Sequence, residues 1–259
     1  MLETQIHPTA VIDDSAEIGP DVTIGPYAVL GPNVRVGAGT TIAPHVHIMR
    51  DTTLGKGCSI HHGAAIGGDP QDLKYGGEQT ELVIGDRTVV REFVTLNRGT
   101  HANGRTQIGS DCLIMAYTHV AHDCIIGDKV VLANAVNMGG HVTIEDHVIV
   151  GGMTAVHQFA RIGRHAFVGG MSAVLKDVAP YVKAAENPIK LFGLNSVGLQ
   201  RRGFSDETRL AIKRAFRLLF RSSLNITQAI EQARAELPDS PELRHFLEFI
   251  ETSERGVVV

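Results

Sequence analysis

The chain has 259 residues, enough to bury a sizeable core in one large or two small domains. Its 24 Lys and Arg residues are outnumbered by 28 Asp and Glu residues, so the overall basic excess of many nucleic-acid-binding proteins is missing. No run of 18 apolar residues occurs, and three scattered cysteines (Cys58, Cys112 and Cys124) are too few for a disulfide framework. We therefore expect a cytoplasmic protein with no integral membrane segment and no nucleic-acid partner.

Aliphatic residues recur at every sixth position through most of the chain. The pattern occupies residues 6–66, resumes over 84–96 and continues over 108–174, always without a polar interruption. Because about half of the residues in ordinary proteins are apolar, 26 such positions have a chance probability on the order of 10⁻⁸. The six-residue period predicts short strands stacked into a parallel β-helix, with rungs ~4.8 Å apart.

Two further features accompany the period. The residue four places after each aliphatic position is small or β-branched nearly throughout, as at Ala28, Thr40 and Cys124, which predicts a second inward residue in each hexad. We interpret the cysteines at these positions as packing residues. Glycine often follows the aliphatic position directly, as at Gly25 and Gly37, and we expect these glycines to supply corners with permissive backbone angles.

The pattern is interrupted by two segments, residues 67–82 and 98–107, which we expect to loop outward and to carry function. It ends near Val178, and residues 188–259 carry helical rather than six-residue spacing. Helix starts are predicted at Ser205, Thr227 and Asp239-Ser240-Pro241. The predicted organisation is a β-helix over residues 1–187 and a helical domain over residues 188–259.

The helical region is locally basic. Between residues 201 and 221, seven basic residues face two acidic ones: Arg201, Arg202, Arg209, Lys213, Arg214, Arg217 and Arg221. The cluster is either a solvated helix face or a docking surface for an acidic partner.

The repeats resemble the hexapeptide-repeat family of left-handed parallel β-helices, in which three hexads form one triangular coil of 18 residues. With that step, His122, Gly140 and Gln158 fall in one column, and Asp123 and His141 fall in the next. A histidine beside a glycine peptide offers a general base next to a backbone N–H that can stabilise an oxyanion, as acyl transfer requires.

Two other interpretations of these histidines stay open. His122 could simply lie on the surface of a coil. Alternatively, His119, His122 and His141 could bind zinc between subunits, as in the γ-class carbonic anhydrases that share this solenoid. A carbonic anhydrase would have no evident need for the helical region and its basic cluster.

Longer motifs make the resemblance specific. QDLKYGGE, VTLNRGT, THVAHDC, GGHVTI, GGMTAVHQFARIG and GLNSVGLQRRGFS are similar to motifs of the UDP-N-acetylglucosamine O-acyltransferases of lipid A synthesis, in the same order over nearly the whole chain. The resemblance implies a homotrimer that transfers an (R)-3-hydroxyacyl group from acyl carrier protein to the 3-hydroxyl of UDP-N-acetylglucosamine. It implies no metal and no protein-bound cofactor, because the donor carries its own phosphopantetheine.

The resemblance also implies roles for individual residues. His122 matches the catalytic base, Asp123 is its expected orienter, and Gly140 matches the donor to the oxyanion. The matched substrate-binding positions are Asp72, Lys74, Asn97, His119, His141, His157, Gln158, Gly170, Asn195, Arg201 and Arg202. Of these, Asn195, Arg201 and Arg202 match groups near the nucleotide and its diphosphate, and Gly170 matches the stop of the acyl groove.

Gly170 bears on the length of the acyl chain. Its column reads Ala116, Asn134, Gly152 and Gly170, so two successive rungs present no side chain. The sequence therefore predicts a deep groove and a preference for roughly 12 to 14 carbons.

Two positions depart from the family pattern. Asn97 stands where a histidine is usual, and Val197 stands where a glutamate near the ribose is usual. The alternatives are an acceptor with a 3-amino group, another hexapeptide acyltransferase, or a non-catalytic solenoid. The N-acyltransferase of the same pathway carries an additional N-terminal domain, whereas the pattern here begins at Ile6.

Overall fold

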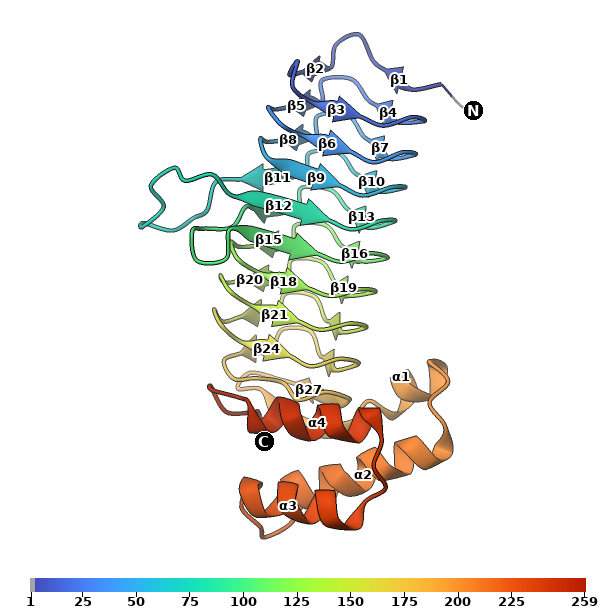
Figure 1. Ribbon diagram of the computed structural model, residues 1–259, viewed down its shortest axis with the longest axis vertical. Helices are drawn as coiled ribbons and strands as arrows, with labels where there is room; N and C mark the ends of the chain where they lie inside the picture. Colours follow the sequence, from blue (N-terminus) through green and yellow to red (C-terminus); the bar gives the residue numbers. More distant parts are fainter. Residues whose placement is uncertain (1–2) are drawn as a thin grey trace.

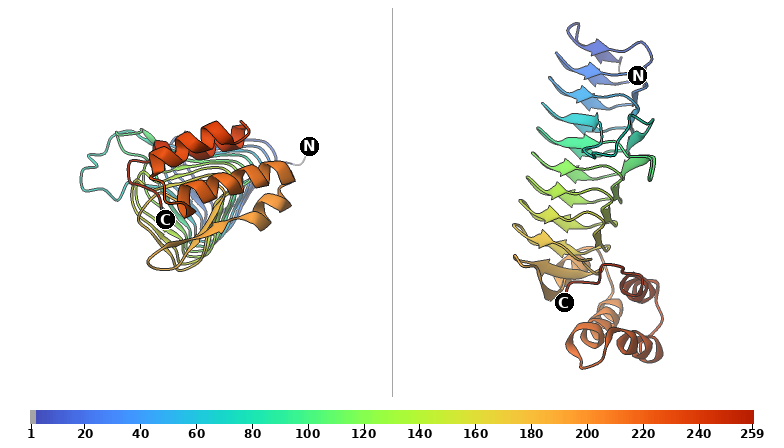
Figure 2. Two further views of the ribbon diagram at one scale, coloured as in Figure 1. Left: turned by 90° about the horizontal axis from the view of Figure 1, so that it is seen from below. Right: turned by 90° about the vertical axis from the view of Figure 1, so that its left-hand side faces the viewer.

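Residues 3–259 are described by a computed structural model, in which most of the chain coils into a three-sided prism (Figure 1). Strands β1 to β26 each contain one of the 26 periodic aliphatic residues, so the strand positions predicted from the period are confirmed. Successive strands pass from face 1 to face 2 to face 3 of the prism, and each face is one sheet. Seen from below, the coils lie almost directly over one another (Figure 2).

The strands of each face are parallel, apart from the last strand of face 1. Face 1 contains β1 (Gln5–Ile6), β4 (Thr23–Ile24), β7 (Thr41–Ile42), β10 (Ser59–Ile60), β13 (Val89–Val90), β16 (Leu113–Ile114), β19 (Val131–Leu132), β22 (Ile149–Val150), β25 (Phe167–Val168), β27 (Val182–Ala185) and the antiparallel β28 (Lys190–Leu194). Face 2 contains β2 (Val11–Ile12), β5 (Val29–Leu30), β8 (His47–Ile48), β11 (Ala65–Gly68), β14 (Thr95–Asn97), β17 (His119–Val120), β20 (Asn137–Met138), β23 (Ala155–Val156) and β26 (Ala173–Val174). Face 3 contains β3 (Glu17–Ile18), β6 (Arg35–Val36), β9 (Thr52–Leu54), β12 (Glu81–Ile84), β15 (Arg105–Ile108), β18 (Ile125–Ile126), β21 (Thr143–Ile144) and β24 (Arg161–Ile162).

Strand pairing shows where the extra residues leave the prism. Paired residues are 18 apart in regular coils, as for Ile6 and Ile24. The first loop (residues 69–80) lies between β11 and β12, and the second loop (residues 98–104) lies between β14 and β15. Both are shorter than the predicted breaks 67–82 and 98–107, because β11, β12 and β15 extend by pairing with neighbouring coils. Both loops project from one side of the prism (Figure 1).

The core fills the inside of the prism with the two inward residues of each hexad. Cys58, Cys112 and Cys124 lie among them as free, buried thiols. Burial raises the pKa of Cys112 to about 11 and that of Cys124 to about 12. These thiols therefore stay protonated at neutral pH and act as small packing groups.

The corner glycines have a different role from the expected one. The left-handed backbone angles of the regular coils occur three residues after the aliphatic position, at residues such as Tyr27 and Asp123, and not at Gly25 or Gly37. A Cβ added to Gly37 would lie 2.5 Å from the Gly55 carbonyl carbon of the next coil. Glycine is therefore needed there because the coils approach closely, and not because of its backbone freedom.

Four helices follow the prism: α1 (Ser196–Arg201), α2 (Asp206–Arg221), α3 (Ile226–Glu236) and α4 (Pro241–Glu251). Ser205 and Ser240 cap α2 and α4 as predicted, whereas the cap of α3 is Asn225, two residues before the predicted Thr227, because Asn225 and Gln228 form a capping box. The helical assignment of residues 188–194 was wrong, since β28 pairs there with β27.

The helices cover the lower end of the prism in Figure 1. His245 of α4 lies with its Nε2 2.7 Å from the carboxylate of Glu145 in the turn after β21. The guanidinium of Arg161 in β24 stacks on Phe249 of α4 at 4.2 Å from the ring centre. Among residues 3–259, no helix combines the length and the apolar character needed to cross a bilayer.

Candidate active site

A histidine and a carboxylate form a hydrogen-bonded pair at the corner between faces 2 and 3. His122 and Asp123 occupy the turn after β17, where Asp123 has a left-handed backbone φ of 59°. Asp123 Oδ2 lies 2.8 Å from His122 Nδ1, and the aspartate is only 1% exposed. The carboxylate therefore accepts a hydrogen bond from His122 Nδ1–H, which leaves the Nε2 lone pair free to accept a proton.

Asp123 is held in its charged form. Burial opposes its ionisation, but hydrogen bonds from His122 and Thr100 outweigh burial and lower the pKa of Asp123 below its ordinary value. An ionised aspartate fixes the orientation of the imidazole and stabilises the imidazolium that forms when His122 accepts a proton.

Gly140 lies in the next coil, directly against His122. A Cβ added to Gly140 would lie 2.5 Å from His122 Cε1 and 2.7 Å from Nε2, so only glycine leaves room for the imidazole. Within the described chain, the Gly140 N–H donates to no backbone acceptor. The arrangement places a potential base beside a free peptide donor.

Two other histidines flank the pair. His141 Nε2 lies 3.6 Å from Asp123 Oδ2, and its ring stacks on Phe159 with the ring centres 4.6 Å apart. His119 Nδ1 lies 2.7 Å from Thr95 Oγ1. Burial lowers the pKa of both imidazoles. The charge of His122 lowers the pKa of His119 further, whereas the charges of Asp123 and Asp72 offset the effect of burial on His141 only in part. Both imidazoles are therefore neutral at physiological pH.

The geometry bears on the zinc alternative. The ligand atoms that lie within 4.8 Å of one another belong to His122, Asp123 and His141, and His119 is not part of this group. Tetrahedral zinc ligands at ~2.1 Å from the metal are separated by about 3.4 Å, whereas His122 Nδ1 and Asp123 Oδ2 are 2.8 Å apart. That distance is a hydrogen bond, so His122 Nδ1 and Asp123 Oδ2 are not placed as two ligands of one tetrahedral zinc ion.

The predicted residues of the first loop lie near this corner. Asp72 Oδ1 accepts the Lys74 N–H at 3.0 Å, which forms a tight turn with the exposed lysine at its end. The Asp72 charge acts on His141, so the loop reaches the same side of the prism as the pair. His157 and Gln158 lie in the turn after β23, one coil beyond Gly140, where Gln158 N approaches Gly139.

Asn97 is placed differently from the other candidates. It is 7% exposed, and its Nδ2 donates to the Asp69 carbonyl at 2.6 Å. Its side chain therefore supports the base of the first loop and offers little surface to a ligand.

The candidate nucleotide residues lie on another side of the prism. Asn195 caps α1 and donates to the His165 carbonyl at 2.9 Å, and both Arg202 amino groups bond to His147. A cavity of about 410 Å³ on face 1 is lined by Ile149, Phe167, Lys183, Leu194, Asn195, Ser196, Val197, Gly198, Arg201 and Arg202. Face 1 lies opposite the corner that carries His122.

Gly170 occupies a third position, the corner between faces 1 and 2. Its added Cβ would lie 3.1 Å from the Gly152 carbonyl oxygen, so the two glycines stack as the column predicts. One chain thus brings together His122, Asp123, Gly140 and His141, but it holds the groove and nucleotide candidates apart from them.

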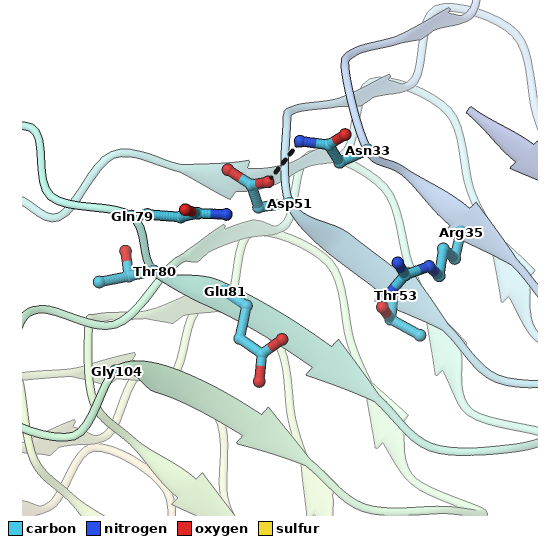
Figure 3. A pocket seen from close by; sticks show the side chains of 8 residues that line it. All are labelled: Asn33, Arg35, Asp51, Thr53, Gln79, Thr80, Glu81 and Gly104. Atoms are coloured by element: carbon cyan, nitrogen blue, oxygen red, sulfur yellow. Dashed lines mark hydrogen bonds between the residues drawn. The ribbon is translucent and has the colours of Figure 1, made fainter. Parts of the chain in front are cut away.

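Two further cavities open on the surface of the prism. One of about 520 Å³ adjoins the pair and is lined by His141, Thr143, Phe159, Arg161, Asp177, Thr252, Glu254 and Arg255. Another of about 470 Å³ lies beside the first loop on face 3, where Asn33 donates to Asp51 at 2.9 Å (Figure 3). The second cavity contains none of the candidate site residues.

Comparison with known proteins identifies the family of the chain. Residues 3–38, 33–68 and 105–140 match the family model for bacterial transferase hexapeptide repeats, and residues 177–258 match domain 2 of UDP-N-acetylglucosamine O-acyltransferase. The acyl-(acyl-carrier-protein)–UDP-N-acetylglucosamine O-acyltransferase of Myxococcus xanthus is 52% identical over 254 residues, which cover 98% of each chain. The chain belongs to the UDP-N-acetylglucosamine O-acyltransferase family.

Solved structures of this acyltransferase family give the same assignment. LpxA from Acinetobacter baumannii superposes with a TM-score of 0.95 and 46% identity, covering 98% of this chain and 99% of that one. LpxA from Bacteroides fragilis superposes with a TM-score of 0.96 and 39% identity, covering 98% and 100%. The predicted fold class, a left-handed parallel β-helix with a C-terminal helical part, is confirmed, as is the resemblance to this enzyme family.

The sequence did not point to every residue around the pair. Thr100 of the second loop, His147 and Phe159 contact candidate residues, and Arg98 of the same loop bonds to Tyr75 of the first loop. Phe159 follows Asp123 and His141 in the 18-residue column and could have been found from it. Thr100 and Arg98 lie in a break of the period, which removes that signal.

Proposed function

We propose that this acyltransferase moves an (R)-3-hydroxyacyl chain from acyl carrier protein to the 3-hydroxyl of UDP-N-acetylglucosamine, the first step of lipid A biosynthesis. The observation that carries the proposal is the His122 imidazole, hydrogen-bonded at 2.8 Å to Asp123 and lying against Gly140. The relatives' names supply the donor and the acceptor.

In the proposed reaction, His122 Nε2 takes the proton of the sugar 3-hydroxyl while that oxygen attacks the thioester carbonyl carbon. The Gly140 N–H stabilises the oxyanion that forms. When the tetrahedral intermediate collapses, the carbon–sulfur bond breaks and protonated His122 delivers its proton to the pantetheine sulfur. The two substrates and His122 account for every proton and bond in these steps, so the reaction requires no metal and no protein-bound cofactor.

We propose a homotrimer because the candidate groups lie on different sides of one prism. His122 is at the corner between faces 2 and 3, whereas Gly170 is at another corner and Arg201 lines a cavity on face 1. One bound substrate can meet all of them when neighbouring copies pack corner to face. Light scattering should then give three times the 27.9 kDa chain mass.

Within that site, we assign Asp72, Lys74, His119, His141, His157 and Gln158 to the sugar and the reacting end of the acyl chain. Arg201, which is exposed in the last turn of α1, is assigned to the diphosphate. Arg202 bonds to the ring and the carbonyl of His147 and so holds the C-terminal end of α1 against the prism. Val197 lines the same cavity without offering a hydrogen bond, so we expect weaker contact with the ribose there.

The decisive experiment supplies the protein with UDP-N-acetylglucosamine and with hydroxyacyl carrier proteins carrying 10, 12, 14 and 16 carbons. Mass spectrometry should find the sugar nucleotide with one acyl chain, and no such product would contradict the proposal. A parallel reaction with the 3-amino analogue of the acceptor tests N-acylation, which the relatives' names do not favour. We place this reaction in the cytoplasm, where three free thiols stay reduced.

The basic residues of α2 are expected to receive the carrier protein. Lys213, Arg214 and Arg217 are exposed, and a cavity of about 480 Å³ beside them has Leu218 and Leu237 in its wall. Reversing the three charges to glutamate should raise the KM for acyl carrier protein by about tenfold or more, because steering by opposite charges is lost. The KM for the sugar nucleotide should not change.

The control reverses Lys56, Arg105 and Lys129, three exposed basic residues of the prism, and so changes net charge equally. If neither the α2 reversals nor the salt concentration changed the KM for acyl carrier protein, the docking surface would lie elsewhere.

Gly170 is expected to set the length of the acyl chain. It is exposed at its corner next to the exposed side chains of Met153 and Met171, and its own lack of a side chain deepens that surface. The wild type should prefer roughly 12 to 14 carbons, since each buried methylene contributes about 0.8 kcal/mol until the groove ends. Gly170→Met should shift the preference shorter by roughly three or four carbons, the reach of that side chain.

Competition among the four carrier proteins measures both preferences. Gly31→Met is a matched control, because its Cβ would lie 3.1 Å from a backbone atom of a neighbouring coil, as it would at Gly170. An unchanged preference in a folded Gly170→Met enzyme would remove Gly170 as the stop.

A further inference from the structure

The second loop, residues 98–104, contacts the carboxylate of the catalytic pair. Thr100 is 3% exposed, and its N–H donates to Asp123 Oδ1 at 2.9 Å. Its hydroxyl lies 2.7 Å from Asp123 Oδ2, the oxygen that also accepts from His122. One residue thus holds both carboxylate oxygens.

The direction of the Thr100 hydroxyl proton follows from its surroundings. The Ala102 N–H donates to Thr100 Oγ1 at 3.2 Å, so the hydroxyl oxygen already acts as an acceptor there. Asp123 is ionised and can only accept. The Thr100 hydroxyl therefore donates its own proton to Asp123 Oδ2.

The loop itself is well anchored. The Gly104 N–H donates to the Thr100 carbonyl at 2.7 Å, which closes the turn. Arg98, only 1% exposed, donates to the carbonyl of Gly67 and to the carboxylate of Asp69 at the base of the first loop, and to the Tyr75 hydroxyl at 3.2 Å. The clamp on Asp123 is consequently a rigid part of the fold and joins the catalytic corner to the first loop.

We propose that Thr100 is a positioning residue that orients the Asp123 carboxylate toward His122 and weakens its basicity. The proposal rests on the proposed function of His122 and concerns the same site. Without the hydroxyl, Oδ2 keeps its bond with His122, and the only hydrogen bond from Thr100 that remains is that of its N–H to Oδ1. The carboxylate then turns more freely, and its less dispersed charge stabilises the protonated form of His122.

Thr100→Val removes the hydroxyl and keeps the branched shape of the side chain. We expect kcat to fall about tenfold, because small misplacements of a reacting group are costly, while the KM for the sugar nucleotide stays the same. The acidic limb of the pH–rate profile should move upward by about half a pH unit. Thr100→Ser keeps the hydroxyl and should restore both kcat and the profile to within about threefold of wild type.

Thr88→Val is the matched control. The Thr88 hydroxyl is also fully buried in the prism, donates to the Gly109 carbonyl at 2.8 Å and accepts the Cys112 N–H, but it does not touch the pair. This variant should lose stability as Thr100→Val does and keep wild-type kcat. Equal losses of kcat in both valine variants would overturn the proposal, as would a Thr100→Val enzyme with the wild-type kcat and pH profile.

A substrate-free measurement separates this proposal from the proposed function. In protein labelled with ¹⁵N-histidine, the His122 Nδ1–H bonded to Asp123 should give a downfield proton signal, assigned by its loss in His122→Ala. The signal should shift or broaden in Thr100→Val and persist in Thr100→Ser and Thr88→Val. An unchanged signal in Thr100→Val would contradict the positioning role, even if the acceptor proved to be a different sugar.

Discussion

His122→Ala is expected to lower kcat by about 10²–10⁴-fold, the usual contribution of a general base. The imidazole is the group that lies against Gly140, and its Nδ1 is already bonded to Asp123, so Nε2 is the atom that can take the acceptor proton. The side chain adds little to the core, because the turn is held by the backbone bond from His141 N to His122 O at 3.0 Å. The coils and the proposed trimer should therefore persist, as checked by circular dichroism and light scattering.

His62→Ala provides the comparison for this variant. His62 occupies the equivalent turn position after β10 and contacts the Pro44 carbonyl at 3.2 Å, away from Asp123. It should keep wild-type kcat within about twofold. A His122→Ala enzyme that retained more than half of its activity would show that another group takes the proton.

The prism was predictable because one physical rule repeats along it. Strand pairing forces each inward side chain over the one 18 residues earlier, as Ile144 lies over Ile126, so a polar residue at any step would be buried without a partner. The rule ends where pairing changes direction. β28 turns back antiparallel on β27, and no period marks residues Lys190–Leu194 as a strand.

The candidate site was predictable only where its residues lie in the 18-residue columns. The 18-residue column placed His122 beside Gly140, and the structure has the two in contact. Thr100 could not be found in this way, because it precedes Asp123 by 23 residues and reaches it through a loop outside the columns. Asn97 shows the converse, since its position in a motif suggested a ligand contact and its burial under the first loop gives it a supporting role.

Gly140→Ala tests the contact between the column partners without removing any functional group. The added Cβ would lie 2.5 Å from His122 Cε1, whereas ordinary contacts begin near 3.4 Å. The imidazole must therefore move by roughly 1 Å, and a shift of that size can lower a rate by about 10²-fold. The variant keeps the N–H of residue 140 and both members of the pair, so a loss of kcat reports on placement alone.

The measurement is kcat with saturating sugar nucleotide and acyl carrier protein, compared with Gly31→Ala. Gly31 is also a corner glycine, and its added Cβ would lie 3.1 Å from Arg50 N, which a small shift of the coil relieves. That control should lose some stability and little activity. If Gly140→Ala retained full kcat while His122→Ala did not, His122 would have to leave the Gly140 peptide during the reaction. The base and the oxyanion donor must contact the same tetrahedral intermediate. If His122 moved away from residue 140, the donor to the oxyanion would therefore be another backbone N–H.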